Sequence, residues 1–190
     1  MERAENLQRF SLDKHERMFD NGNMKCVASI STKSPLYQRW YRDLPDHARL
    51  CWDIMLKTGL RLSDALTLTK EECDAGYKIE RKTKKRRRIN FKPPPYIKTG
   101  LLIPNRNGQA YHRTTFEKIY KRDREALHFP APLNAHSARK MYALALLQRT
   151  HDLTAVQRDL DHKYLSTTLL YLYGHPHITR KGRITNDARE

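Results

Sequence analysis

The residues best suited to chemistry lie near the C-terminus, in the segment His162-Lys-Tyr-Leu-Ser-Thr-Thr-Leu-Leu-Tyr171. A histidine there precedes a tyrosine by nine positions, with hydroxyl side chains between them. Upstream, His136 and Arg139 stand three positions apart, and Arg61 lies further upstream after Thr-Gly-Leu. Taken in this order, these segments suggest attack on a phosphodiester by a tyrosine nucleophile, without a metal.

Cleaving a phosphodiester without a metal requires a nucleophile, cations for the phosphoryl oxygens, an acid for the leaving oxygen, and positioning. Arginine suits the second task because its planar fork stays charged and holds two phosphate oxygens. His136 and Arg139 at i, i+3 would face one phosphate from one helix. Asp64, three residues after Arg61, would lie on the same face and orient it. Lys82 ends a predicted strand that leads into a basic turn, from which it can reach a groove.

Each of these features also has an ordinary structural interpretation. A single tyrosine on an apolar helix is usually a core residue, and a single histidine such as His162 is more often a capping or surface residue. Residues 82–88 contain six basic residues in seven, typical of a solvated loop, a localisation signal or general nucleic-acid contact. Arg61 alone would be an ordinary residue at a helix start. The chemical interpretation therefore depends on the whole set occurring in order.

The charge of the chain favours a polyanionic partner. Lys and Arg number 37 against 21 Asp and Glu, a formal net charge of +16 over 190 residues, about the size of one domain. Nucleic acid is the first candidate and an anionic membrane surface the second. No apolar run approaches the roughly 18 residues of a membrane span, and the N-terminus lacks the apolar stretch of a secretory signal.

The pattern of cysteines and the absence of a glycine-rich phosphate loop restrict the class of protein further. Three cysteines without C-x-x-C spacing predict free thiols in a reducing compartment, with Cys51 in the core. No Cys/His cluster has the spacing of a structural zinc site, and no glycine-rich phosphate loop is present. We therefore expect no metal and no nucleotide cofactor.

The predicted elements make the class mainly α with a small antiparallel β-sheet. A short helix is expected over 6–19, and residues 23–40 read as an irregular lead-in or linker. Two short strands, at 76–82 and 87–92, flank a basic turn, and Asn105 to Gly108 reads as a further turn. The remaining helices are expected from Pro45 to about Thr58, and at 61–68, 114–127, 135–149, 154–160 and from about Ser166 through Tyr171.

Three segments resemble motifs of the tyrosine recombinases, also called the phage integrase family. Thr58-Gly-Leu-Arg-Leu-Ser-Asp64 is similar to the family's first-arginine segment, Gly-Leu-Arg-x-Ser-Glu/Asp. Glu80-Arg-Lys-Thr-Lys-Lys-Arg86 is similar to its β-hairpin, in which the catalytic lysine falls on Lys82. His136-Ser-Ala-Arg139 matches the family's His-x-x-Arg.

Two further segments complete the resemblance, which covers roughly residues 45–173. Leu160-Asp-His162 is similar to Leu-Gly-His, and Ser166-Thr-Thr followed by Tyr171 matches the nucleophile segment. Asp161 replaces the usual glycine, which alters the turn and places a carboxylate beside the site. Ala138 replaces the leucine usual before the second arginine, which concerns packing more than chemistry.

The resemblance implies a role for each residue of the site. Tyr171 would attack the scissile phosphate and hold a 3′-phosphotyrosyl link, which a free 5′-hydroxyl would later reverse. Arg61, Arg139 and His162 would stabilise the pentacoordinate phosphate. Lys82 would protonate the leaving 5′-oxygen, and His136 would assist proton transfer from the tyrosine. Because the link conserves the bond energy, no nucleotide cofactor is needed.

Neighbouring residues either support these roles or compete for them. Lys84 and Lys85 are rivals of Lys82. Tyr173 is a rival of Tyr171, although helical geometry turns it some 200° away, and Tyr164 is too near His162 to fit the spacing. The basic residues expected to contact DNA are Lys84, Lys85, Arg86, Arg87 and Arg88.

The resemblance also sets expectations for organisation and partners. We expect an N-terminal extension or linker at 1–40, a tyrosine recombinase catalytic domain at 41–174 and a basic, loose C-terminal tail at 175–190. The first forty residues are too few for the family's N-terminal clamping domain, which predicts either a catalytic fragment or a natural single-domain member like the fimbrial inversion recombinases. The expected partner is a double-stranded DNA recombination site.

Several functional alternatives share these residues. The leading hypothesis is a site-specific recombinase or integrase that is a monomer when free and a tetramer on DNA. It would be cytoplasmic and associated with the nucleoid, in a bacterial, phage or mobile-element context. A topoisomerase IB-like or telomere-resolvase-like enzyme would use the same chemistry, and a basic DNA-binding regulator would use none of it.

Overall fold

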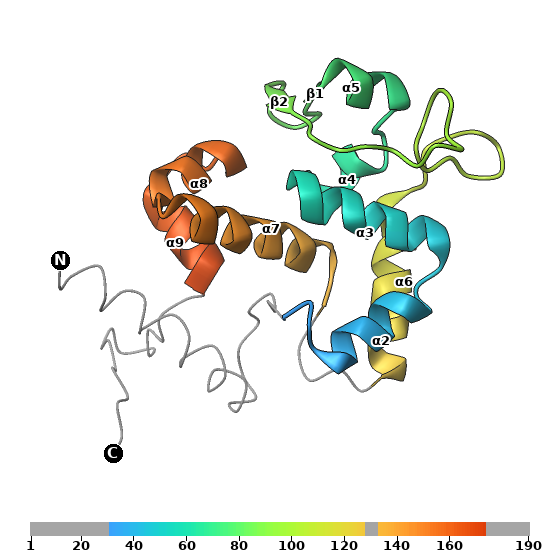
Figure 1. Ribbon diagram of the computed structural model, residues 1–190, viewed down its shortest axis with the longest axis horizontal. Helices are drawn as coiled ribbons and strands as arrows, with labels where there is room; N and C mark the ends of the chain where they lie inside the picture. Colours follow the sequence, from blue (N-terminus) through green and yellow to red (C-terminus); the bar gives the residue numbers. More distant parts are fainter. Residues whose placement is uncertain (1–30, 128–132, 174–190) are drawn as a thin grey trace.

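The computed structural model describes residues 31–127 and 133–173, which form helices packed around one another with a small sheet at one side (Figure 1). The predicted helix at 6–19, Cys26 and the predicted basic tail lie outside the described residues. The described elements are α2 (Pro35–Asp43), α3 (Asp46–Thr58), α4 (Leu62–Ala65), α5 (Lys70–Ala75), β1 (Tyr77–Ile79), β2 (Arg86–Arg88), α6 (Arg113–Ala126), α7 (Ala135–Thr150), α8 (Leu153–Leu160) and α9 (Leu165–Tyr173). The class is the predicted one, mainly helical with a two-stranded antiparallel sheet. No helix among the described residues is long and apolar enough to cross a membrane.

The segment expected to be an irregular lead-in contains a helix, and the prediction for residues 35–40 is wrong. Helix α2 begins with Pro35 in its first turn, where the missing N–H costs nothing. Tyr37 and Trp40 are buried, and the indole N–H of Trp52 donates to the Tyr37 hydroxyl at 2.8 Å. Apolar burial against α3 therefore stabilises a segment that composition alone had marked as polar.

The region that presents Arg61 is built from three consecutive helices. Helix α3 ends at Gly59, whose φ of +64° is the left-handed conformation that glycine adopts without strain. Helix α4 is shorter than the predicted 61–68 helix, and α5 was not predicted. Helix α5 begins with a capping box in which Thr69 and Glu72 each accept from the other's backbone N–H. Arg61 occupies the position just before α4.

The two strands form the predicted hairpin, with Lys78 opposite Arg87 in antiparallel register. The turn between them contains the expected basic run, and Lys84 adopts a φ of +58° there. Side chains alternate in β2, so that Arg86 and Arg88 are exposed whereas Arg87 is buried. The hairpin therefore turns Arg86 and Arg88 toward solvent, whereas Lys78 and Arg87 are buried against the protein.

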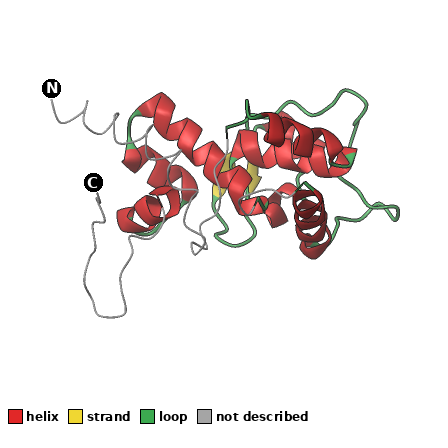
Figure 2. Ribbon diagram, turned by 90° about the horizontal axis from the view of Figure 1, so that it is seen from below, coloured by secondary structure: helices red, strands yellow, loops and turns green. Residues whose placement is uncertain are grey.

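The C-terminal half agrees with the predicted helices. Helices α6, α7, α8 and α9 each lie within a few residues of their predicted bounds. Asn134 caps α7 and Asp152 caps α8, each through a side chain that accepts a backbone N–H. Figure 1 shows α7 running between α3 on one side and α8 with α9 on the other. The turned view in Figure 2 shows the mainly helical architecture, with the short strands among the helices.

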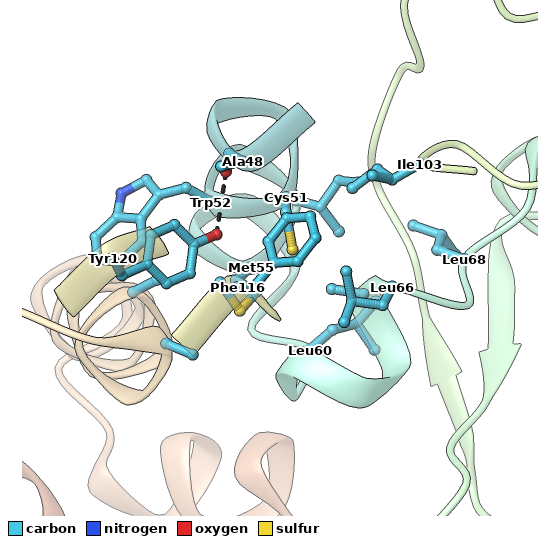
Figure 3. Packing of buried hydrophobic residues seen from close by; sticks show 14 of the residues in the cluster. Ala48, Cys51, Trp52, Met55, Leu60, Leu66, Leu68, Ile103, Phe116 and Tyr120 are labelled. Carbon is cyan, nitrogen blue, oxygen red and sulfur yellow. Dashed lines mark hydrogen bonds between the residues drawn. The ribbon is translucent and has the colours of Figure 1, made fainter. Parts of the chain in front are cut away.

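The buried apolar side chains form two separate clusters. The larger one joins α2, α3, α6 and the segments around α4, and it contains Trp40, Trp52 and Tyr120. The hydroxyl of Tyr120 donates to the carbonyl of Ala48 at 3.0 Å inside it (Figure 3). Cys51 is fully buried in this cluster as predicted.

The smaller cluster lies between the C-terminal part of α7 and helices α8 and α9. Its buried members are Ala143, Leu146, Val156, Leu160 and Leu172. Tyr171 packs against it. Helix α7 contributes side chains to both clusters, since Ala138 and Met141 belong to the larger one.

Candidate active site

Tyr171 lies half-buried on α9, next to the start of α7. Its hydroxyl donates a hydrogen bond to the backbone carbonyl of His136 at 3.1 Å. Its ring meets the ring of His162 edge to face, with centroids 5.4 Å apart and an interplanar angle of 80°. The structure therefore brings together the tyrosine and the two histidine segments that were predicted to share a site.

His162 is held in place by α8 and α9. Its backbone N–H donates to the carbonyl of Gln157 at 3.0 Å, and its Nδ1 lies 3.0 Å from the hydroxyl oxygen of the buried Thr168. Burial lowers the pKa of His162, and the positive charges of Arg139 and Arg61 lower it further, against the smaller effect of Asp161. The imidazole is therefore neutral at neutral pH in the protein without DNA.

Arg139 connects the two halves of the site. Its Nη1 donates to the carbonyl of Gly59 at 2.6 Å, and its Nη2 donates to the carbonyl of Leu160 at 2.9 Å. Burial lowers the pKa of Arg139 to about 10, and the nearby cations Arg61 and Arg87 contribute to the lowering. The guanidinium remains charged at neutral pH and is fixed by backbone atoms from both sides.

Arg61 forms an ion pair with Glu80, a residue that the motif analysis did not single out. The Arg61 Nη1 lies 2.6 Å from Oε2 of Glu80, and the hydroxyl of Thr83 donates to the same oxygen at 2.7 Å. Burial raises the pKa of Glu80, but these two hydrogen bonds and the charges of Arg61 and Arg87 outweigh it and leave the pKa below its usual value. Glu80 is therefore ionised and links the first arginine to the hairpin.

Asp64 does not orient Arg61 as expected. Its Oδ1 accepts from the backbone N–H of Arg81 at 2.9 Å, and the residue is fully buried. Asp64 thus holds the start of the hairpin turn, and the expected partnership with Arg61 is taken by Glu80. The sequence separation of 19 residues between Arg61 and Glu80 explains why a helical spacing rule did not find the pair.

Lys82 lies in the exposed turn between the two strands, two residues after Glu80. The structure brings its turn to the site through Glu80, because Arg61 and the Thr83 hydroxyl both donate to Oε2 of Glu80. Lys84, Arg86 and Arg88 are also exposed around it, which is compatible with the expected DNA contacts.

Two members of the basic run are engaged within the protein. Arg87 is buried, contrary to its expected role in DNA contact, and its Nε donates to the carbonyl of Thr58 at 3.0 Å. Its Nη2 lies 2.7 Å from Oδ2 of Asp159. Lys85 forms an ion pair with Asp161. The basic run therefore contains one buried arginine, because side chains alternate in direction along β2, and one exposed lysine that an ion pair holds.

The hydroxyl of Tyr171 is protonated in this arrangement. Burial raises the pKa of Tyr171 to about 12, and the charges of Arg139 and Arg61 oppose part of the increase. The two arginines therefore already act on the phenol electrostatically. A phosphate bound to the arginines would offset part of their positive charge and so weaken their effect on the pKa of Tyr171.

His136 contributes to the site through its backbone as well as its side chain. Its N–H donates to the Asn134 side chain at 2.9 Å in the cap of α7, while its carbonyl accepts from Tyr171. Burial, Arg139 and Arg113 lower the pKa of the imidazole, against Glu117. A neutral imidazole at the start of α7 can accept a proton.

The rival tyrosine Tyr164 is largely exposed, at 58%, with the ammonium of Lys163 5.2 Å from its ring centroid. Its contacts within the described residues do not include the arginines or His162.

Among the described residues, no group of three or more His, Cys, Asp or Glu side chains is arranged to hold a metal ion. The assembled groups are therefore one phenol, two arginines, two neutral imidazoles and a lysine-bearing turn.

The sequence matches a known family over most of its length. The model of the phage integrase family matches residues 37–177. A tyrosine recombinase XerD of Listeria monocytogenes serotype 4b is 25% identical over 178 residues, which cover 82% of this chain and 56% of the relative. A XerD of Halalkalibacterium halodurans is 33% identical over 79 residues, which cover 42% of this chain and 25% of the relative. The chain thus spans about half the length of the XerD relatives that it matches over most of its own length.

Solved structures share the fold. The XerH site-specific recombinase bound to difH substrate superposes with a TM-score of 0.55 at 22% identity, covering 78% of this chain and 51% of that one. A lambda integrase dimer bound to a COC′ core site gives a TM-score of 0.62 at 16% identity, covering 87% and 65%. The catalytic domain of bacteriophage HP1 integrase gives 0.55 at 20% identity, covering 79% and 89%.

Proposed function

This chain belongs to the phage integrase family, and we propose that it acts as a site-specific DNA recombinase or integrase that cleaves and rejoins strands through a 3′-phosphotyrosyl intermediate. The observation that carries the proposal is the placement of Tyr171. Its phenol lies against His162 and within the electrostatic field of Arg139 and Arg61. The resemblance in motif order pointed to the same residues, and their contacts support that assignment.

The two arginines retain donors for a phosphate. A guanidinium has five N–H groups, and Arg139 uses two of them in its recorded bonds to Gly59 and Leu160. Arg61 uses one in its recorded bond to Glu80. A scissile phosphate between the two guanidinium groups would take donors that are still available, and negative charge developing on its oxygens would be stabilised there.

The cleavage step follows from this arrangement. The oxygen of Tyr171 forms a bond to phosphorus, the bond from phosphorus to the 5′-oxygen breaks, and the phenolic proton passes to an acceptor. We assign that acceptor to the neutral imidazole of His136, whose own backbone holds the phenol. Lys82 gives a proton to the leaving 5′-oxygen. Rejoining runs the same steps backward with a 5′-hydroxyl as the nucleophile.

We propose a double-stranded DNA recombination site as the partner. The exposed Lys84, Arg86 and Arg88 on the hairpin would contact its phosphates. The structurally similar lambda integrase forms a tetramer bound to a Holliday junction, and we propose a tetramer on DNA here, with a monomer in its absence. XerD relatives are bacterial, and a bacterial, phage or mobile-element setting on the nucleoid is part of the proposal.

Covalent capture on nicked DNA tests the function. The probe is a labelled library of short duplexes with a randomised centre and a nick, from which the cleaved fragment diffuses away and traps the intermediate. We expect a protein–DNA adduct that forms in the presence of a metal chelator, resists denaturant and is lost in Tyr171→Phe. Tyr164→Phe and Tyr173→Phe are the matched controls and should retain it.

The outcomes separate the competing functions. An adduct that persists in Tyr171→Phe would refute the assigned nucleophile, and absence of any adduct in the wild-type protein would refute the proposed chemistry. Relaxation of a supercoiled plasmid without recombinant products from two copies of the captured site would support the topoisomerase-like alternative. A sedimentation series that gives a stable tetramer without DNA would contradict the proposed free monomer.

A further inference from the structure

Two ion pairs join the β-hairpin to the C-terminal end of α8. Lys85 in the hairpin turn pairs with Asp161, and Arg87 in β2 pairs with Asp159 through a distance of 2.7 Å. Arg87 also donates to the backbone carbonyl of Asp159. Lys85 and Arg87 are two residues apart in the hairpin, and Asp159 and Asp161 are two residues apart at the end of α8. The two ion pairs are therefore adjacent connections between the same two elements.

These elements carry different parts of the proposed machinery. The hairpin turn carries Lys82, three residues before Lys85. The end of α8 leads directly into His162, which follows Asp161. The two ion pairs therefore tie the exposed lysine turn to the segment that packs against the nucleophile.

Asp161 occupies an unusual backbone position. Its φ of +56° is in the left-handed region, which glycine adopts most readily and Asp or Asn tolerate. Its backbone N–H closes α8 by donating to the carbonyl of Arg158 at 3.2 Å. Helix termination needs only this backbone conformation, which glycine would provide with less strain. The carboxylate adds something that termination does not require, namely the contact with Lys85.

The Lys85–Asp161 pair is the more accessible of the two. The Lys85 side chain is 67% exposed, whereas that of Arg87 is 8% exposed. Arg87 is also anchored to the carbonyl of Thr58. The inner pair therefore fixes β2 to the body of the protein, and the outer pair acts on the turn beyond it.

We propose that Asp161 is a positioning residue, which holds the hairpin turn through Lys85 so that Lys82 reaches the leaving 5′-oxygen. The proposal rests on the proposed function, because it assigns a role relative to the cleavage step. Asp161 contacts Lys85 and ends α8, and the proposed cleavage step gives it no contact with the reacting atoms. Its loss should leave the nucleophile and the arginines in place and impair delivery of the proton.

A change in the leaving atom separates this role from a general structural one. In the natural step, the bond from phosphorus to the 5′-oxygen breaks and the oxygen takes a proton from Lys82. When sulfur replaces that oxygen, the thiolate leaves without needing the proton, since thiols are far stronger acids than alcohols. A defect in proton delivery should therefore disappear on the sulfur substrate.

The experiment uses nicked duplexes with the sequence recovered by covalent capture, made with either oxygen or sulfur at the scissile 5′ position. Asp161→Asn keeps a residue that tolerates the left-handed conformation and removes only the charge. We expect adduct formation about tenfold slower than wild type on the oxygen substrate, since small misplacements of catalytic groups cost up to about 100-fold. On the sulfur substrate the two rates should agree within about twofold.

Two further variants complete the design. Asp74→Asn removes the carboxylate of another Lys–Asp pair, Lys70–Asp74, which lies within α5 and does not involve the hairpin turn, and should match wild type on both substrates. Asp161→Gly provides a second variant in case Asn perturbs the turn, and it should show the same oxygen-specific defect. DNA affinity should not fall in either Asp161 variant, because each removes a negative charge from a basic protein.

Each outcome decides between the proposals. If wild type forms no Tyr171 adduct on either substrate, the proposed function fails. If wild type reacts and the Asp161 variants are equally fast on oxygen, or equally slow on both substrates, the positioning role of Asp161 fails while the proposed function stands. An oxygen-specific defect supports the role.

Discussion

In the protein without DNA, the hydroxyl of Tyr171 donates a hydrogen bond to the backbone carbonyl of His136, 3.1 Å away. A peptide carbonyl accepts a hydrogen bond but cannot act as a base at neutral pH. The phenol is therefore held in its neutral form, and cleavage requires that the proton move to another acceptor when the phosphate arrives.

This contact leads to a prediction about the ionisation of Tyr171. Burial raises its pKa from 10 to about 12, while Arg139 and Arg61 oppose the increase. A near-ultraviolet titration of wild type minus Tyr171→Phe should show one phenol that ionises near pH 12. Because the pKa is raised in the folded state, the contribution of Tyr171 to stability is complete below pH 10 and is lost as pH rises toward 12. Arg61→Ala should raise the pKa further, and a phenol that ionises near 10 in wild type would contradict the buried placement.

Glu80 should support stability mainly through Arg61. Glu80→Gln leaves Arg61 and Arg87 without their buried counter-charge, so the free energy of unfolding at pH 7 should fall by about 2–3 kcal/mol, somewhat less than for a fully buried pair because Arg61 is partly exposed. The pKa of Glu80 is lowered on folding, so its contribution is complete above its unfolded pKa and is lost as pH falls through the folded value. Urea unfolding should therefore show that the difference in free energy of unfolding between wild type and Glu80→Gln becomes smaller as the pH is lowered. The control Asp74→Asn should change the free energy of unfolding little. If the effect of Glu80→Gln were the same at every pH, the ionised carboxylate of Glu80 would not be its cause.

Gly59 and Gly108 offer a matched pair of substitutions. Both have positive φ, +64° and +74°. A Cβ at Gly59 would lie 2.4 Å from the Tyr142 ring and 2.8 Å from the Arg87 guanidinium, whereas one at Gly108 meets nothing within 4 Å. Gly108→Ala should cost about 1 kcal/mol from backbone strain alone, and Gly59→Ala about 3 kcal/mol because overpacking adds to the strain. Thermal unfolding measures both, and equal losses would contradict the close packing at Gly59.

Shifting the Gly59 backbone should also affect chemistry, since its carbonyl accepts from Arg139. We expect Gly59→Ala to slow adduct formation under conditions where the protein remains folded. Gly108→Ala should leave the rate unchanged, because that turn makes no contact with the site in the described residues.

Arg87 and Arg88 are neighbours in β2 with opposite roles. Arg87→Ala removes the ion-pair partner of Asp159 and one of the two cations beside Glu80, which keeps Arg61, and should lower the free energy of unfolding by about 3 kcal/mol. Arg88→Ala should change stability by less than about 0.5 kcal/mol. In DNA binding, only Arg88→Ala should reduce the slope of log K against log salt, by about 0.9 for one lost phosphate contact. A reversed pattern in the two measurements would show that the faces of β2 have been misassigned.

The positions of most helices followed from apolar spacing and caps, and the order of the site segments followed from motif spacing. Helix α5 was missed although Thr69 and Glu72 have the spacing of a capping box, because the short helix has almost no apolar stripe. Helix α2 was missed because Tyr37 and Trp40 lie among charged residues, and only their burial against α3 distinguishes them from a linker.

Pairings across large sequence separations were beyond the reach of spacing rules. Arg61 was assigned to Asp64 because the two are three residues apart, yet the tertiary fold brings Glu80 to it instead. Arg87 was grouped with its basic neighbours, although period-two alternation with the buried Ile89 would have separated it. Composition reports the charge of such a run, whereas the strand decides which charge enters the protein.

The two apolar clusters place Tyr171 and Arg61 beside different cores. Helix α7 contributes to both, and Arg139 donates to a backbone carbonyl on each side. The site is thus assembled across a seam, and neither half contains a complete set of groups. A local opening of α8 and α9 that leaves the larger core folded would carry Tyr171 and His162 away from Arg61 together. The proposed cleavage therefore requires α8 and α9 to be packed against the larger core. While they are open, a phosphate bound at Arg61 would lie out of reach of Tyr171.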